Sequence, residues 1–139
     1  MSLDIHFFKK DVDFEDLRRK IDDLYNKRRT MGDELEHLED VYKEAKLASH
    51  NVTHNLSKMA EAVGLDKVLW YPEEIGITSA SQMIVPLEKA IKELETNPDK
   101  YKTYNPPNGW GNFDIFVSFC RSVLRTCKEN PDAVIEAGR

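Results

Sequence analysis

The sequence is poor in cysteine, has no long run of apolar residues and carries no excess of basic side chains. Its two cysteines, Cys120 and Cys127, are seven positions apart, roughly 10 Å along one helix, which is too far for a disulfide bond. No segment approaches the roughly 18 apolar residues that a membrane-spanning helix needs, and the N-terminus lacks the pattern of a secretory signal. We therefore expect reduced thiols in the core and a cytoplasmic protein that does not bind membranes.

The charge balance and the missing motifs exclude further classes of protein. The formal net charge is −5, whereas a nucleic-acid-binding surface is normally basic. The chain contains no glycine-rich phosphate loop, no nucleophile elbow and no Cys-x-x-Cys pair. His50 and His54 have the four-residue spacing of helical metal ligands, but no third ligand follows at a diagnostic distance. We expect no nucleic-acid partner, no cofactor, no metal ion and no enzymatic activity.

The sequence does contain a globular composition and a long amphipathic pattern. Hydrophobic residues make up 40% of the chain and charged residues 32%, which predicts one domain over 1–139. Between about 13 and 46, apolar residues recur alternately three and four positions apart, as along the seam of a coiled coil. This charged segment is either one long helix or a hairpin of two helices broken near 30–33. The unbroken phase of the seam across Gly32 favours the single helix.

Shorter patterns predict the rest of the fold. Apolar and polar residues alternate over 3–8, which predicts a strand, and 133–136 can form a second strand that pairs with it and joins the two termini. Helical patterns run over 51–63, over 78–96 and over 112–130. We therefore predict a mainly α (α+β) fold with a long N-terminal amphipathic helix, or a helical hairpin, and a small two-stranded sheet.

Three polar motifs carry a resemblance. They are the ten residues from Asn51 to Ala60 (NVTHNLSKMA), the ten from Leu69 to Thr78 (LWYPEEIGIT) and the eight from Tyr104 to Gly111 (YNPPNGWG). With these motifs, residues 49–137 resemble a family of small uncharacterised proteins of bacteriophages and bacteria. The resemblance implies an α+β fold whose terminal strands meet, but no activity. The segment at about 13–46 departs from the family, in which the connection is usually shorter.

The long seam suggests a protein-interaction function. An unbroken helix of about 33 residues spans roughly 50 Å, more than a compact chain of this size can cover. We therefore expect a non-enzymatic interaction module that binds a protein partner or forms a homo-oligomer. If the chain is phage-encoded, it would act in the host cytoplasm, for example as an inhibitor of a host defence protein. The interaction residues that we expect are Leu17, Ile21, Leu24, Arg28, Met31, Leu35, Leu38 and Tyr42.

The alternative is a protein that binds or sequesters a small, nucleotide-like molecule. Short hydrogen-bonding side chains cluster at a predicted helix start after residue 50, and the loop over 105–111 adds two glycines and a tryptophan. Equally, these residues could form only a helix cap and a tight turn. The ligand-binding candidates are Asn51, Thr53, His54, Asn55, Asn108 and Trp110.

Overall fold

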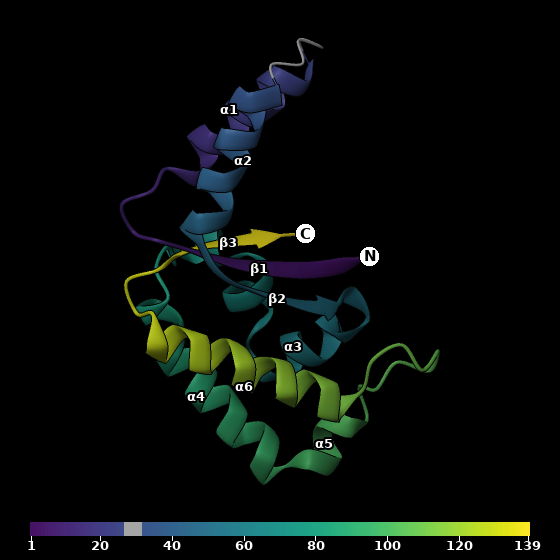
Figure 1. Ribbon diagram of the computed structural model, residues 1–139. Helices are drawn as coiled ribbons and strands as arrows, with labels where there is room; N and C mark the ends of the chain where they lie inside the picture. Colours follow the sequence, from purple (N-terminus) through teal and green to yellow (C-terminus); the bar gives the residue numbers. More distant parts are fainter. Residues whose placement is uncertain (27–31) are drawn as a thin grey trace.

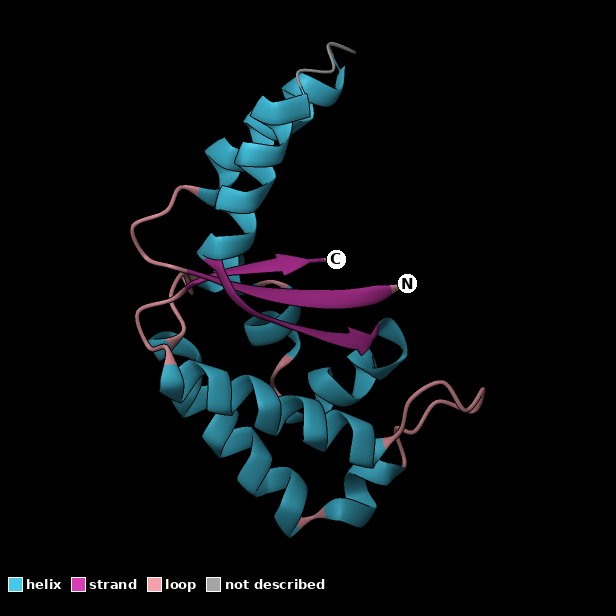
Figure 2. Ribbon diagram, viewed as in Figure 1, coloured by secondary structure: helices cyan, strands magenta, loops and turns pink. Residues whose placement is uncertain are grey.

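The computed structural model describes residues 1–26 and 32–139, which form a sheet with helices on both of its faces (Figure 1). One face of the sheet is covered by the helices of the C-terminal two thirds of the chain, which we call the body. A pair of helices, which we call the arm, rises from the opposite side of the sheet and projects away from it (Figure 2). The two parts therefore share the sheet and little else.

The sheet has three antiparallel strands in the order β2-β1-β3. The strands are β1 (Ser2–Phe8), β2 (Lys46–Thr53) and β3 (Val134–Gly138). β3 pairs with β1, as the sequence predicts for the two termini, but the prediction of a two-stranded sheet is wrong because β2 lies along the other side of β1. The sequence does not predict β2 because its core-facing positions are not strongly apolar. Two of them, which pair with core-facing residues of β1, are Ala48 and His50.

The body is built around α4 (Ser81–Thr96) and α6 (Phe113–Glu129), which pack side by side beneath the sheet. The predicted helix over 51–63 is wrong in its first half. β2 continues to residue 53, a 3-10 turn follows, and only then does α3 (Ser57–Val63) begin. The short helical segments are η1 (His54–Leu56), η2 (Asp66–Trp70), η3 (Pro72–Ile75) and α5 (Pro98–Lys102).

One apolar core joins the sheet to the body. Leu3, Ile5 and Phe7 of β1 point into it from above, and Phe116 of α6 and Leu87 of α4 meet them from below; all five are fully buried. Burial of this much apolar surface is the main source of stability for a chain of this size. The sheet and the helices of the body therefore share one continuous core.

The arm consists of α1 (Phe14–Asn26) and α2 (Gly32–Ala45), so the predicted single long helix is wrong. The two helices run antiparallel, and the Tyr25 hydroxyl near the end of α1 donates a hydrogen bond to Glu39 of α2 at 2.7 Å. An unbroken heptad phase does not distinguish one long helix from a hairpin of two helices. In either arrangement the apolar residues of the seam lie along one side of each helix. The predicted break near 30–33 falls largely outside the described residues, but α2 begins at Gly32, a poor residue for a helix interior.

A second, smaller core fixes the base of the arm to the sheet. It consists of Phe8 at the end of β1, Phe14 at the start of α1 and Ala45 at the end of α2. The rings of Phe8 and Phe14 stack with centroids 4.3 Å apart and planes inclined by 9°. This stack lies on the face of the sheet opposite the main core, because Phe8 continues the alternation of Asp4 and His6.

Candidate functional site

Six of the eight predicted interaction residues lie on α1 and α2, the two helices of the arm. Leu17, Ile21 and Leu24 on α1 and Leu35, Leu38 and Tyr42 on α2 are all partly buried, and none is fully buried. Arg28 and Met31 lie outside the described residues. Within the described parts of the two helices, only Phe14 and Ala45 at the base are buried. The seam is thus folded back on itself, which the single-helix prediction did not foresee, but it is not enclosed by the rest of the chain.

The two helices of the arm differ in charge. α1 contains four acidic and three basic residues, whereas α2 contains six acidic residues and one lysine. Glu36, Asp40 and Glu44 are spaced four residues apart on one side of α2 and are exposed. α2 therefore presents an acidic surface next to the partly buried apolar seam.

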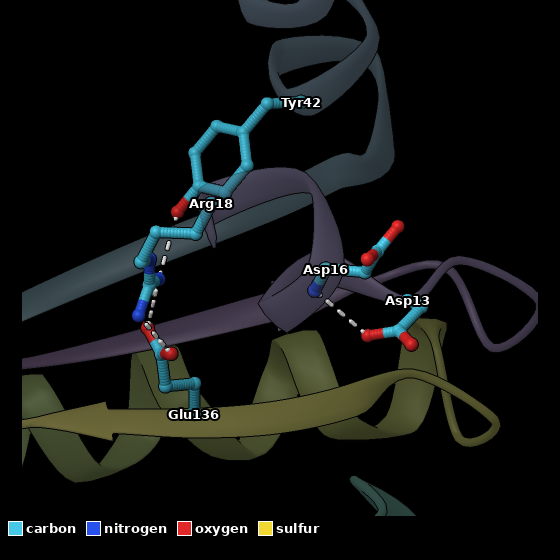
Figure 3. A network of polar contacts seen from close by, with 5 residues as sticks. All are labelled: Asp13, Asp16, Arg18, Tyr42 and Glu136. Atoms are coloured by element: carbon cyan, nitrogen blue, oxygen red, sulfur yellow. Dashed lines mark hydrogen bonds and ion pairs between the residues drawn. The ribbon is translucent and has the colours of Figure 1, made fainter. Parts of the chain in front are cut away.

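An ion-pair network joins the arm to the last strand (Figure 3). The Arg18 guanidinium of α1 donates to both carboxylate oxygens of Glu136 in β3, at 2.5 and 2.6 Å, and to the Tyr42 hydroxyl of α2 at 3.0 Å. The hydrogen bonds from Arg18 to Glu136 raise the pKa of Arg18 above its usual value. Bidentate pairs of this kind fix an orientation as well as a distance. Asp13 caps α1 by accepting a hydrogen bond from the Asp16 amide at 3.0 Å.

Sequence reasoning missed this network. Arg18 lies beside the seam and resembles any other charged helix residue, and Glu136 lies in a strand 118 positions away. Only the pairing of His6 with Glu136 in the sheet register places the carboxylate beneath the arm. A signal was present in the alternation of β3, since Glu136 follows the buried Ile135 and must face the opposite side of the sheet.

The second group of predicted residues is only partly brought together. His54 and Asn55 from η1 and Asn108 from the loop after α5 line one cavity of about 480 Å³. The cavity also includes Asn105 and Tyr104, which sequence reasoning did not single out. Two distant segments therefore meet here, as the alternative hypothesis required.

The other three predicted ligand residues have different positions. The Asn51 amide donates to Ser2 and Asp4 across the sheet, at 2.8 and 2.7 Å. Thr53 caps η1, accepting a hydrogen bond from the Asn55 amide at 3.3 Å. Trp110 is 70% exposed and does not line the cavity.

Gly111 allows the loop after α5 to approach η1 closely. Its φ is +100°, and a Cβ atom placed there would lie 2.8 Å from Cγ2 of Thr53 and 3.1 Å from Cγ of Leu56. Any side chain at this position would therefore both strain the backbone and push the loop away from the cavity. One of the two glycines of this loop therefore serves a close approach to the protein itself.

The remaining reactive groups have structural roles. Cys120 and Cys127 are buried in the main core, and burial raises the pKa of both thiols, that of Cys127 to about 12. His50 accepts or donates a hydrogen bond with the Thr126 hydroxyl of α6 at 2.7 Å, and burial lowers its pKa. In the described ranges 1–26 and 32–139, no three His, Cys, Asp or Glu side chains form a group that could hold a metal ion.

The arm and the cavity are thus two regions of the described structure whose geometry offers a function. None of the helices in the described part of the chain is long and apolar enough to cross a membrane. No protein-family model, curated protein or solved structure matches the chain.

Proposed function

We propose that this protein is a non-enzymatic interaction module that binds a protein partner through its α1–α2 arm. The observation that carries the proposal is the partial burial of the seam, from Leu17 at the base to Leu24 and Leu35 farther out. In a two-helix hairpin, each seam residue is covered by one neighbouring helix only, whereas a third helix would cover the remaining side. A partner helix laid along the seam therefore gains apolar burial that the body does not provide.

The charge of α2 favours a partner with a basic surface. Six acidic residues and one lysine on this helix attract basic side chains and repel a second acidic α2 at close range. A second copy of this chain is therefore a less favourable occupant than a different protein with lysine or arginine beside an apolar stripe. A host protein, such as a component of a bacterial defence system, is the partner that the family resemblance suggested and stays a prediction.

The anchor at the base suits this role. The Phe8–Phe14 stack and the Arg18–Glu136 pair hold the arm to the sheet at one end and leave its outer part projecting. A rigid base lowers the entropic cost of binding, because the docking surface is already oriented before the partner arrives. Removing this anchor is expected to weaken binding without touching the partner.

The test uses charge-reversal variants of matched net charge. In Glu36→Lys/Asp40→Lys two exposed residues of α2 are reversed, and in Glu61→Lys/Glu129→Lys two exposed residues of the body are reversed as the control. A photo-reactive amino acid at Tyr25, which is 59% exposed, captures partners in cells that encode the protein, and each captured protein is then purified. Isothermal titration calorimetry then measures the affinity of the purified partner for the wild type and for both variants.

We expect the α2 variant to weaken binding about tenfold or more, equivalent to about 1.4 kcal/mol, and the body variant to leave the affinity unchanged. Higher salt weakens binding to the wild type and has less effect on the α2 variant. Equal affinities for the two variants would contradict the proposal. Sedimentation equilibrium tests whether the arm binds a second copy of this chain instead. A wild-type dimer that the α2 variant disrupts would show that the partner is a second copy and would contradict a basic partner.

A further inference from the structure

The cavity between η1 and the loop after α5 has its own binding chemistry, independent of the arm. Its volume of about 480 Å³ lies in the range of small-molecule sites. It is lined on one side by His54, Asn55 and Lys58, and on the other by Tyr104 and the residues that follow it. The fixed approach of Gly111 to η1 holds the two sides together.

His54 presents a hydrogen-bond donor on the side of the ring away from the core. The buried Trp70 indole N–H donates to Nδ1 of His54 at 2.9 Å. An indole nitrogen can only donate, so Nδ1 is the acceptor, and the ring proton of the neutral imidazole resides on Nε2. The imidazole thus lines the cavity with its orientation and tautomer fixed from behind.

Two asparagines of the loop are oriented in a similar way. Oδ1 of Asn105 accepts a hydrogen bond from the Phe113 amide at 2.8 Å, and Oδ1 of Asn108 accepts one from the Trp110 amide at 2.9 Å. Their oxygens are therefore occupied by the loop itself. The side-chain NH₂ groups have no hydrogen-bond partner among residues 1–26 and 32–139 and are available as donors.

The charge of the cavity is opposite to that of the chain. None of the ten lining residues is acidic and one is Lys58, although the protein carries a net charge of −5. Lys58 forms no ion pair within the described part of the chain. Donors on both sides and a lysine suit a ligand group that only accepts hydrogen bonds and carries negative charge. The Tyr104 ring, 40% exposed at the rim, offers a flat surface for stacking.

We propose that this cavity binds a phosphomonoester attached to a planar ring, such as a nucleoside 5′-monophosphate. The phosphate oxygens accept hydrogen bonds from His54 Nε2, from the Asn105 and Asn108 amides and from Lys58. The planar ring of the ligand stacks on Tyr104. Trp110, which the sequence predicts as a ligand-binding residue, does not line the cavity. This site goes beyond the proposed interaction function and does not depend on it.

Titration by ¹H–¹⁵N NMR tests the site with AMP, GMP, CMP and UMP, with inorganic phosphate, and with adenosine as the uncharged control. We expect saturable shifts of the His54, Asn55 and Asn108 amide signals with at least one monophosphate and weaker shifts with phosphate alone. No saturable shift at millimolar ligand would overturn the proposal. Adenosine binding as tightly as AMP would overturn the assignment of the phosphate.

Two variants and one control locate the binding. Asn108→Asp keeps the oxygen that caps the loop and replaces the NH₂ donor by a negative charge, and Lys58→Ala removes the positive charge at an exposed position. We expect each to weaken monophosphate binding about tenfold or more, and Lys89→Ala on exposed α4 surface to leave it unchanged. Circular dichroism verifies that each variant is folded. Binding that is insensitive to both variants would place the ligand elsewhere and contradict the proposal.

Discussion

The body and the arm are both helical, yet they differ in how completely their apolar side chains are buried. In the body, helix α6 alone buries Phe116, Cys120, Val123 and Cys127 completely. In the described part of the arm, two helices of similar size bury only Phe14 and Ala45, both at the base. Helical periodicity in the sequence therefore indicates which face of a helix is apolar. How deeply that apolar face is buried depends on how many neighbouring elements surround it. The body has a sheet and several helices around each apolar side chain, and the arm has one neighbouring helix.

The largest contrast is expected between matched truncations in the two regions. Phe116→Ala leaves a cavity in the main core and is expected to destabilise the protein by about 3–5 kcal/mol. Leu38→Ala removes apolar contact from a partly buried seam and is expected to cost about 1 kcal/mol or less of global stability. Urea unfolding followed by circular dichroism measures both. Equal losses would contradict the difference in burial between the arm and the body.

The connection between the two regions gives the next largest effect. A double-mutant cycle of Arg18→Gln and Glu136→Gln isolates their coupling, which we expect to be about 1 kcal/mol because Arg18 is 42% exposed. Breaking the pair should also speed amide exchange in α1 and α2 and leave exchange in α4 and α6 unaltered. A matched surface pair, Lys128 with Glu88, serves as the control, with a coupling near zero. Faster exchange in the body would show that the pair stabilises more than the base of the arm.

The smallest expected effect is the pH dependence of stability that His50 of β2 contributes. Burial lowers the pKa of His50, so the folded state binds fewer protons than the unfolded state when the pH falls below about 6.5. Stability is therefore complete above this pH and decreases as the pH falls through the range below it. The pKa of His6, on the opposite face of the sheet in β1, is also lowered, by desolvation and then by Lys46, so the two histidines contribute with the same sign. Replacing His50 with Gln should flatten the pH dependence of unfolding between 5 and 7; an unaltered slope would assign it to other groups.

The body could be predicted from the sequence better than the arm and the sheet. Gly64 ends α3 with φ of +83°, and Asn112 caps α6 by accepting from the Ile115 amide at 2.9 Å; both follow from local chemistry that needs no knowledge of distant residues. The hairpin of α1 and α2 is only the less favoured alternative in the sequence, because a rod and a hairpin share one heptad phase. β2 could not be predicted, because His50 in its core-facing row satisfies its polar atoms through Thr126 of a distant helix.

The sequence predicts only some of the residues that line the cavity, and the others could not be predicted for one common reason. The sequence indicates His54 and Asn55 because polar residues cluster at a predicted helix start, and Asn108 because it lies in the loop with two glycines and a tryptophan. It does not indicate Lys58 or Tyr104, because a lysine and a tyrosine in exposed segments are ordinary surface residues. Their value comes from the approach of Gly111 to Thr53 and Leu56, which depends on tertiary structure alone.

Native-state hydrogen exchange measured by mass spectrometry tests most directly whether the seam of the arm is left uncovered by the rest of the protein. We expect amides of α1 and α2 beyond the first turn to exchange through local opening, well before global unfolding exposes those of α6. We also expect a captured partner to slow exchange in α1 and α2 specifically. Arm amides that are as strongly protected as those of α6 in the free protein, and that a bound partner leaves unchanged, would contradict it.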